Sequence, residues 1–275
     1  MTRKAFVIGH PIAHSRSPLI HGAWLAEHGI DGTYEAIDVP PDALPGFIER
    51  LRSGEFVGGN VTIPHKEAIF ALCDVVDPLA RTIGAVNTLV RHEGRVLGTN
   101  TDYLGFLGNL DAGAPGWSAG LDAALVLGAG GAARAILVAL ASRRIPVVLV
   151  NRTRDKAEKL AAEIEGDISV APLETLNAVA PHVGLVVNTS SVGMHGTRFA
   201  DFDLARLRPD ALVSDIVYSP LVTPLLAGAA ARGLRIVDGL GMLLHQAVPG
   251  FAAWFGVTPS VTPALRQAIE ASLAP

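Results

Sequence analysis

The segment LVLGAGGAARA, residues 125–135, constrains the fold of this chain most strongly. An apolar strand-like run leads into Gly128, Gly130 and Ala133, which have the spacing G-x-G-x-x-A, and a helix-like run follows. The first glycine permits a tight turn, the second lets the backbone approach a pyrophosphate, and the small third residue lets helix and strand pack closely. Free N–H groups at the helix start favour phosphate binding. The segment predicts a βαβ unit that binds a dinucleotide.

The end of the next strand indicates which dinucleotide is bound. The strand-like run PVVLV ends in NRTRDK, residues 151–156, without a carboxylate at its tip. A carboxylate there accepts a hydrogen bond from the ribose of NAD, whereas Arg152, Arg154 and Lys156 attract the additional phosphate of NADP. The alternative is a solvated basic helix start, which the helix dipole disfavours. The sequence therefore favours NADP over NAD.

Strand-like and helix-like runs alternate along both halves of the chain, which has 275 residues. Apolar strands that alternate with helices predict parallel sheets covered on both faces, and the length suffices for two domains. In the first half we expect strands at 4–9, 33–39 and 56–63, two strands around the turn at 92–94, and helices at 17–29, 41–54 and 64–73. Ser17 is expected to be the N-cap of its helix, with Pro18 at the first helical position.

Composition excludes several classes of function. The net charge of −4 gives no basic field for nucleic acid, and 49% hydrophobic with 17% charged residues is typical of a compact α/β protein. The single cysteine, Cys73, excludes an internal disulfide and favours a reducing compartment. Charged residues interrupt the most apolar region, 123–150, so we expect no membrane span. Metal-ligand clusters of the CxxC kind are absent from the sequence, so we expect no metal centre, and the cysteine count favours a cytoplasmic protein.

Polar side chains collect at predicted strand ends in the first half. Ligands of open α/β sheets bind outside the carboxyl ends of the strands, so these residues predict a site for a hydroxylated ligand. Each residue taken by itself also has a structural interpretation: Lys66 as an ordinary exposed lysine, and Asp102 as the cap of a helix. The residues in question are Asn60, Thr62, Lys66, Asn87, Thr88, Asn100, Thr101 and Asp102.

Nine segments in this order together resemble the shikimate dehydrogenase family: GHPIAHSRSP, NVTIPHK, GAVNT, GTNTDYLG, GAGGAARA, NRT, NTSSVGM, DIVYSPLVTPLL and GMLLHQA. The resemblance implies two α/β domains, each with a mostly parallel sheet flanked by helices, and a deep cleft between them. Residues 1–103, completed by the C-terminal helices at 240–275, would bind shikimate. Residues 104–239 would form a Rossmann-type domain that binds NADP. The implied reaction is the reversible reduction of 3-dehydroshikimate to shikimate by NADPH.

The resemblance also implies roles for particular residues. Lys66 and Asp102 match the catalytic pair of the family, and which of the two transfers the proton stays open. The implied substrate-binding residues are Ser15, Ser17, Thr62, Lys66, Asn87, Asp102, Tyr218 and Gln246. The implied cofactor-binding residues are Gly128, Ala129, Gly130, Gly131, Ala132, Asn151, Arg152, Thr153, Arg154, Lys156, Thr189, Ser190, Met194, Ile216, Gly239 and Met242.

The residue types suit this chemistry. A lysine ammonium beside the C3 oxygen stabilises the negative charge that develops there and can donate the proton. Two alternatives remain at this point. The first is a quinate/shikimate dehydrogenase or a paralogue that acts on a related cyclic polyol acid. The second is a catalytically silent regulator that binds NADP. The presence of both Lys66 and Asp102 argues against the regulator. We expect a monomer or a homodimer.

Overall fold

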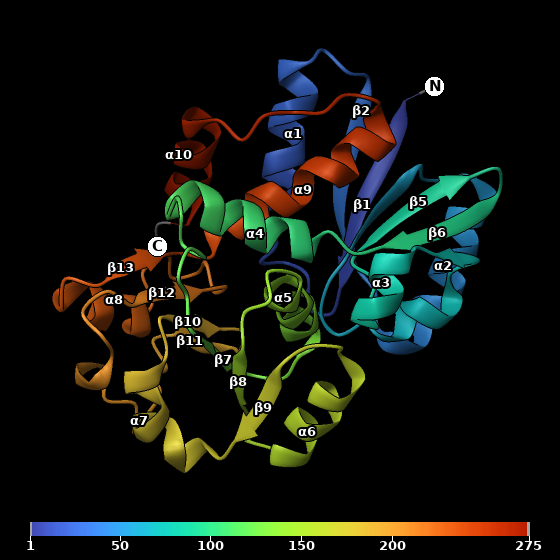
Figure 1. Cartoon of the computed structure of the whole chain (residues 1–275). Helices are drawn as coiled ribbons and strands as arrows, with labels where there is room; N and C mark the ends of the chain where they lie inside the picture. The colour runs from blue at the N-terminus through green and yellow to red at the C-terminus, as the bar shows by residue number, and fades with distance from the viewer. Residues whose placement is uncertain (1, 274–275) are drawn as a thin grey trace. The chain divides into compact units, whose positions relative to one another are not determined.

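The computed structural model describes residues 2–273, which form two compact units (Figure 1). The first unit comprises the chain up to Gly105 together with Leu243–Ser272, and the second comprises Phe106–Met242. The chain enters the second unit within helix α4 (Asp102–Gly113) and leaves it within helix α9 (Leu240–Phe255). The predicted α/β class with two mostly parallel sheets is confirmed.

The first unit is built on a sheet with the strand order β2-β1-β3-β5-β6-β4. β5 runs antiparallel to both of its neighbours, and the other pairs are parallel. The carboxyl ends of β1, β2, β3 and β6 therefore share one edge with the start of β5. The strands are β1 (Arg3–Gly9), β2 (Gly32–Asp38), β3 (Gly58–Val61), β4 (Val75–Val76), β5 (Thr88–His92) and β6 (Arg95–Thr99).

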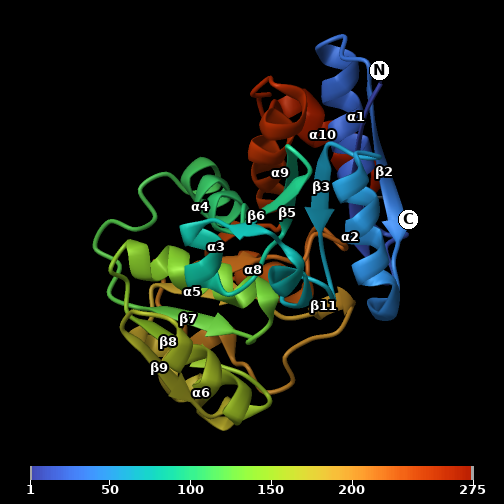
Figure 2. The same cartoon turned by 90° about the vertical axis from the view of Figure 1, so that its right-hand side faces the viewer.

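Helices cover both faces of this sheet (Figures 1 and 2). α1 and α9 lie on one face, where Trp24 of α1 contacts Phe251 of α9. α2 lies on the other face, where Phe47 packs edge-on against Phe6 of β1. The first unit also contains α1 (Ser17–Glu27), η1 (Pro41–Ala43), α2 (Leu44–Ser53), η2 (Ala68–Leu72), α3 (Pro78–Ile83) and α10 (Pro263–Ser272).

The second unit has a fully parallel sheet with the order β13-β12-β10-β7-β8-β9. These six strands are numbered 1 to 6 along the chain, beginning with β7. Read from β9 to β13, the sheet then has the doubly wound order 3-2-1-4-5-6, and the order of the strands reverses between β7 and β10. Ligands of such sheets bind at this reversal, outside the carboxyl ends of the strands. The strands are β7 (Ala124–Leu127), β8 (Val147–Val150), β9 (Ile168–Ala171), β10 (Leu185–Asn188), β12 (Leu212–Asp215) and β13 (Arg235–Val237).

The helices α5 and α6 follow β7 and β8, and α7 and α8 pack on the core formed with β10 and β12. The sequence pattern indicated α5 and the start of α6 but not β9 or the short strand β11. The remaining elements are α5 (Gly131–Ser142), α6 (Arg154–Glu163), η3 (Leu173–Thr175), α7 (Leu176–Val179), η4 (Ala180–His182), β11 (Val192–His195), η5 (Leu204–Arg206) and α8 (Pro224–Ala231).

Two local predictions in the first unit are wrong. The expected helix over 64–73 is a turn followed by the 3₁₀ helix η2, because the carbonyl of Lys66 accepts the N–H of Val86 at 2.8 Å instead of a helical donor. Ser17 is not an N-cap but the first residue of α1. Arg16 holds the cap position without a side-chain cap, and the hydroxyl of Ser15 accepts the N–H of Ser17 at 3.3 Å.

Candidate active site

Lys66 and Asp102 form a shielded ion pair in the first unit. Lys66 lies in the turn after β3, and Asp102 is the first residue of α4, which follows β6. The Nζ of Lys66 lies 2.5 Å from Oδ2 of Asp102, and their side chains are 15% and 7% exposed. The sheet edge thus brings together two charged groups that are 36 residues apart in sequence. Lys66 is therefore not the ordinary exposed lysine of the alternative interpretation.

The second carboxylate oxygen of Asp102 is also occupied. Nδ2 of Asn87 donates to Oδ1 of Asp102 at 2.9 Å. The backbone N–H of Asp102 is capped by Oδ1 of Asn100 at 3.0 Å, so Asn100 serves the start of α4. The alternative that the Asp102 side chain caps this helix is therefore wrong. Its carboxylate instead faces a lysine and an amide.

Asn87 is the centre of the polar network at this edge. Its Oδ1 accepts the N–H of Thr101 at 2.7 Å and the hydroxyl of Thr88 at 2.9 Å. Its Nδ2 lies 3.4 Å from Oε1 of Gln246, which α9 contributes from a point 159 residues further along the chain. Gln246 is held in turn by its own Nε2, which donates to the carbonyl of Leu243 at 3.1 Å. Lys66, Asn87, Asp102 and Gln246 therefore converge in the first unit.

Tyr34 and Asn60 support this network from behind. The hydroxyl of Tyr34 donates to Oδ1 of Asn60 at 2.6 Å, and Nδ2 of Asn60 donates to the hydroxyl of Thr88 at 3.1 Å. Burial raises the pKa of Tyr34, opposed in part by its contacts with Ser17 and Asn60, so its hydroxyl stays a donor. Tyr34 was not among the predicted site residues, because Tyr34 and Asn60 lie 26 residues apart and share no local spacing.

The loop after β1 carries Ser15 and Ser17, and it packs closely on the turn that carries Thr62. Ser17 is 4% exposed, whereas Ser15 and Thr62 are half-buried. A Cβ added to Gly9 would lie 2.6 Å from Cγ2 of Thr62, so only glycine permits this approach. The N–H of Thr62 donates to the carbonyl of Ile8 at 2.9 Å, which holds both segments at the same sheet edge.

In the second unit, the glycine-rich turn has the geometry that its sequence predicts. Gly128 has a φ of 113°, and a Cβ there would lie 2.8 Å from Oγ1 of Thr189, so glycine is required on both counts. A Cβ added to Gly130, by contrast, would meet no atom within 4 Å, so its backbone faces open space at the start of α5. The glycine-rich loop thus leaves the N-terminus of α5 accessible. This helix has twelve residues, and its first turn contains no acidic residue.

The tip of β8 is basic and exposed. Nδ2 of Asn151 donates to the carbonyl of Thr153 at 2.8 Å, which shapes the turn into α6. Arg154 donates to Glu158 at 2.7 Å. Within residues 2–273, Arg152 and Lys156 form no ion pair. Two cations at this helix start therefore keep their capacity to bind an anion.

A buried network shapes the segment after β10. Oδ1 of Asn188 accepts the hydroxyl of Ser190 at 2.7 Å, and its Nδ2 donates to Asp215 at 2.9 Å. Thr223 donates to the other oxygen of Asp215 at 2.7 Å. Burial raises the pKa of Asp215, and the hydrogen bonds from Thr223, Val217 and Asn188 oppose the shift. The segment beginning at Thr189 is thereby fixed beside the glycine-rich turn.

The remaining predicted cofactor residues lie in the same unit. A Cβ on Gly239 would collide with the carbonyl of Ile216, so these two backbones touch. Met242 is 7% exposed and Met194 is 41% exposed. Tyr218, one of the implied substrate-binding residues, follows β12 in this unit and is half-buried.

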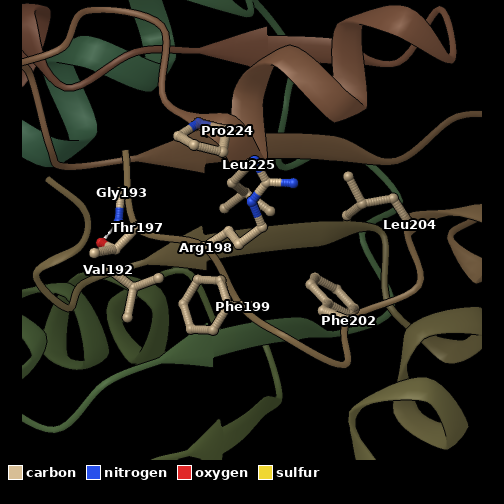
Figure 3. A pocket seen from close by; sticks show the side chains of 9 residues that line it. All are labelled: Val192, Gly193, Thr197, Arg198, Phe199, Phe202, Leu204, Pro224 and Leu225. Carbon is tan, nitrogen blue, oxygen red and sulfur yellow. Dashed lines mark hydrogen bonds between the residues drawn. The ribbon is translucent and has the colours of Figure 1, made fainter. Parts of the chain in front are cut away.

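A cavity of about 150 Å³ lies beside β11 and the start of α8 (Figure 3). Gly193 forms part of its wall and donates its N–H to Oγ1 of Thr197 at 3.0 Å. None of the predicted site residues lines it. The lining residues are Val192, Gly193, Thr197, Arg198, Phe199, Phe202, Leu204, Pro224 and Leu225.

No helix among residues 2–273 has both the length and the apolar character needed to cross a membrane. No group of three or more His, Cys, Asp or Glu side chains in the same range is arranged to hold a metal ion.

Three family models match the chain. They describe a shikimate dehydrogenase substrate binding domain over residues 7–89, a shikimate / quinate 5-dehydrogenase over 118–210, and a shikimate 5′-dehydrogenase C-terminal domain over 239–270. Among curated proteins, the chain is 58% identical to the shikimate dehydrogenase (NADP(+)) of Methylobacterium radiotolerans over 277 residues, which covers 99% of this chain and 98% of the relative.

Solved structures give the same picture. The shikimate 5-dehydrogenase of Thermus thermophilus, in complex with NADP(H) and shikimate, matches with a TM-score of 0.88 and 39% identity, over 99% of this chain and 100% of that chain. The quinate dehydrogenase of Corynebacterium glutamicum, in complex with NAD, matches with a TM-score of 0.89 and 30% identity, over 98% of this chain and 99% of that one.

Proposed function

The chain belongs to the shikimate dehydrogenase family, and we propose that its Lys66–Asp102 pair carries the proton transfer of the reaction. The reaction is the reversible, NADP-dependent reduction of 3-dehydroshikimate to shikimate, a step of aromatic amino-acid biosynthesis. The observation that carries the proposal is the shielded 2.5 Å contact between Lys66 and Asp102, with Asn87 and Gln246 beside it.

Lys66 is the group proposed to hold and move the proton. When bound, NADPH supplies the hydride that reaches C3 of the substrate, and negative charge then develops on the C3 oxygen. The Nζ of Lys66 stabilises that charge and donates a proton to the oxygen; in the oxidative direction the neutral amine accepts it. Asp102 positions Nζ through their ion pair and accepts a hydrogen bond from a ring hydroxyl.

The other polar residues of the first unit are proposed to bind the substrate. The α1 N-terminus, with no acidic residue in its first turn, suits the carboxylate, and Ser15 and Ser17 add hydroxyl donors. Asn87 and Gln246 are buried and lie within the same hydrogen-bonded network, so their amides are held in place for the ring hydroxyls. Thr62 extends this set from the turn after β3.

The second unit is proposed to bind NADP, and its residues fit that group. The open space at Gly130 accommodates a pyrophosphate beside the α5 N-terminus. Arg152 and Lys156, which form no ion pair within residues 2–273, supply cations for the ribose phosphate. The fixed segment from Thr189 through Ser190, together with Gly239 and Met242, is proposed to line the nicotinamide side.

The double variant Arg152→Ala, Lys156→Ala is expected to raise KM for NADP by about tenfold or more, because each charge-assisted hydrogen bond contributes about 1.5–3 kcal/mol. KM for NAD should stay close to that of the parent enzyme, since NAD lacks the phosphate. Lys159→Ala removes an exposed charge from the same helix and serves as the control. Equal changes in KM for both cofactors would contradict a phosphate-specific role.

Steady-state oxidation of shikimate and of quinate, each with NADP and with NAD, tests the function. The highest kcat/KM is expected for shikimate with NADP. A higher value for quinate would favour the quinate-oxidising branch of the family, and a higher value with NAD would contradict the role of the basic tip of β8. If neither acid yields reduced cofactor, the dehydrogenase mechanism proposed here is wrong.

We further propose that the enzyme works in the cytoplasm as a monomer or homodimer. The single, partly buried cysteine fits a reducing compartment. Analytical ultracentrifugation of the purified chain distinguishes the two oligomeric states.

A further inference from the structure

The end of β2 contacts the loop that carries Ser15. Oδ2 of Asp38 lies 2.9 Å from Nδ1 of His10, and Oδ1 accepts the N–H of Ile12 at 3.2 Å. The N–H of Val39 donates to the carbonyl of Gly9 at 3.1 Å. Residues 38 and 39 therefore hold the beginning of this loop through both their backbone and a side chain.

The same two residues contact the turn that carries Lys66. His65 precedes Lys66 and is 1% exposed, and its Nε2 lies 2.7 Å from the carbonyl oxygen of Val39. Because a carbonyl can only accept, Nε2 of His65 carries the hydrogen and donates it. The backbone N–H of His65 also donates to the carbonyl of Thr62 at 2.9 Å, within the turn itself.

The turn that carries Lys66 also contacts the segment just before β5. The carbonyl of Lys66 accepts the N–H of Val86 at 2.8 Å, one residue before Asn87. The backbone around Lys66 is therefore anchored to the end of β2 through the His65 side chain and to the approach to β5 through its own carbonyl. These two attachments determine where the lysine side chain starts on its path to Asp102.

We propose that His65 is a positioning residue for Lys66. Its buried hydrogen bond to Val39 fixes the turn so that Nζ of Lys66 is held both beside Asp102 and at the substrate oxygen. Since the Val39 segment also holds the Ser15 loop, this bond sets the separation between the carboxylate-binding hydroxyls and the lysine. A displacement of about 1 Å in such a constellation costs up to about 100-fold in rate. The inference rests on the proposed role of Lys66.

The test compares His65→Gln, His65→Asn and His65→Phe in the full chain. Gln carries a side-chain N–H on a longer arm, Asn carries one that is too short to reach Val39, and Phe has none. We expect His65→Phe and His65→Asn to lower kcat for shikimate oxidation by about 10-fold to 100-fold. His65→Gln should retain most of the parent kcat. KM for NADP should not change, because the predicted cofactor residues belong to the second unit. His92→Asn, on an exposed histidine, is the control.

Melting temperatures and cofactor titrations separate positioning from simple stability. If Phe and Asn lower the melting temperature but keep the parent kcat per folded enzyme, His65 only stabilises the fold and the inference fails. If His65→Phe does not fold, kcat of His65→Gln is compared with kcat of His65→Asn. Equal values in these two variants overturn the proposal. A parent enzyme without activity on shikimate would instead contradict the proposed function, whatever the variants do.

Discussion

Lys66→Ala is expected to lower kcat for shikimate oxidation by about 10²–10⁴-fold, the range that a positioned acid or base contributes. The reason is that Nζ of Lys66, which lies 2.5 Å from Oδ2 of Asp102, is the group proposed to donate the proton to the substrate oxygen. Affinity for NADP should change by less than about threefold, since the predicted cofactor residues lie in the second unit. Stopped-flow hydride transfer and fluorescence titration of NADPH measure the two quantities separately.

The variant Asp102→Asn tests which member of the pair transfers the proton. If Lys66 does so, Asp102→Asn should lower kcat less than Lys66→Ala does, because an amide still offers one oxygen as an acceptor. A larger loss in Asp102→Asn than in Lys66→Ala would assign the transfer to the carboxylate. Circular dichroism shows whether both variants remain folded, because Asp102 is 7% exposed and loses its cation in the lysine variant.

The second large effect concerns His21 and acid stability. His21 is fully buried and stacks on Tyr34 with ring centroids 3.9 Å apart. Neither of its ring nitrogens meets a hydrogen-bond partner among residues 2–273. Burial lowers the pKa of His21 from 6.5 to about 3, with partial opposition from the side chain of Asn60. The folded state thus keeps the imidazole neutral where the unfolded state is protonated.

The sign of the effect follows from proton binding. Above pH 6.5 neither state binds the proton at His21, and its full contribution to stability is present. As the pH falls from 6.5 toward 3, the unfolded state takes up a proton that the folded state does not, so the free energy of unfolding decreases. The loss from this one group reaches about 3 kcal/mol at pH 4.5 and about 4 kcal/mol at pH 3.

Urea unfolding of the parent and of His21→Phe, followed by circular dichroism between pH 7.5 and pH 4.5, measures this loss. The phenylalanine variant should lose about 3 kcal/mol less than the parent over that interval. His28→Gln changes an exposed histidine just beyond the end of the same helix and should keep the parent slope. His245, half-buried with a lowered pKa, contributes equally to all three proteins, so the differences isolate His21. Identical slopes for parent and phenylalanine variant would refute the assignment.

The second unit could be predicted from the sequence in more detail than the first. Strand, glycine turn and helix at Gly128 determine the geometry of this turn locally. The strands β9 and β11 escaped prediction because neither is a continuous apolar run: Ser169 interrupts β9, and Gly193 and His195 interrupt β11.

In the first unit, local rules competed with long-range contacts. A serine before a proline is a good N-cap by local rules, yet Ser17 lies inside the helix beside Tyr34 while Ser15 accepts its N–H. Pro64 suggested a helix start, but the Lys66 carbonyl bonds to Val86 instead. The sequence predicted that the polar residues would gather at the edge of the sheet. It did not predict the network of Tyr34, Asn60 and Asn87, because that network depends on the directions of side chains across three strands.

The passage of the chain through α4 and α9 also sets an order of synthesis. Phe106–Met242 of the second unit is one continuous stretch, so a ribosome releases it before the first unit is complete. Trp254 of α9 donates to the carbonyl of Leu89 at 2.8 Å, and Phe251 packs against Trp24, so the core beside α1 waits for the last helices. Although domains commonly fold in the order in which they emerge, the N-terminal segment here lacks part of its core until the last helices have been translated.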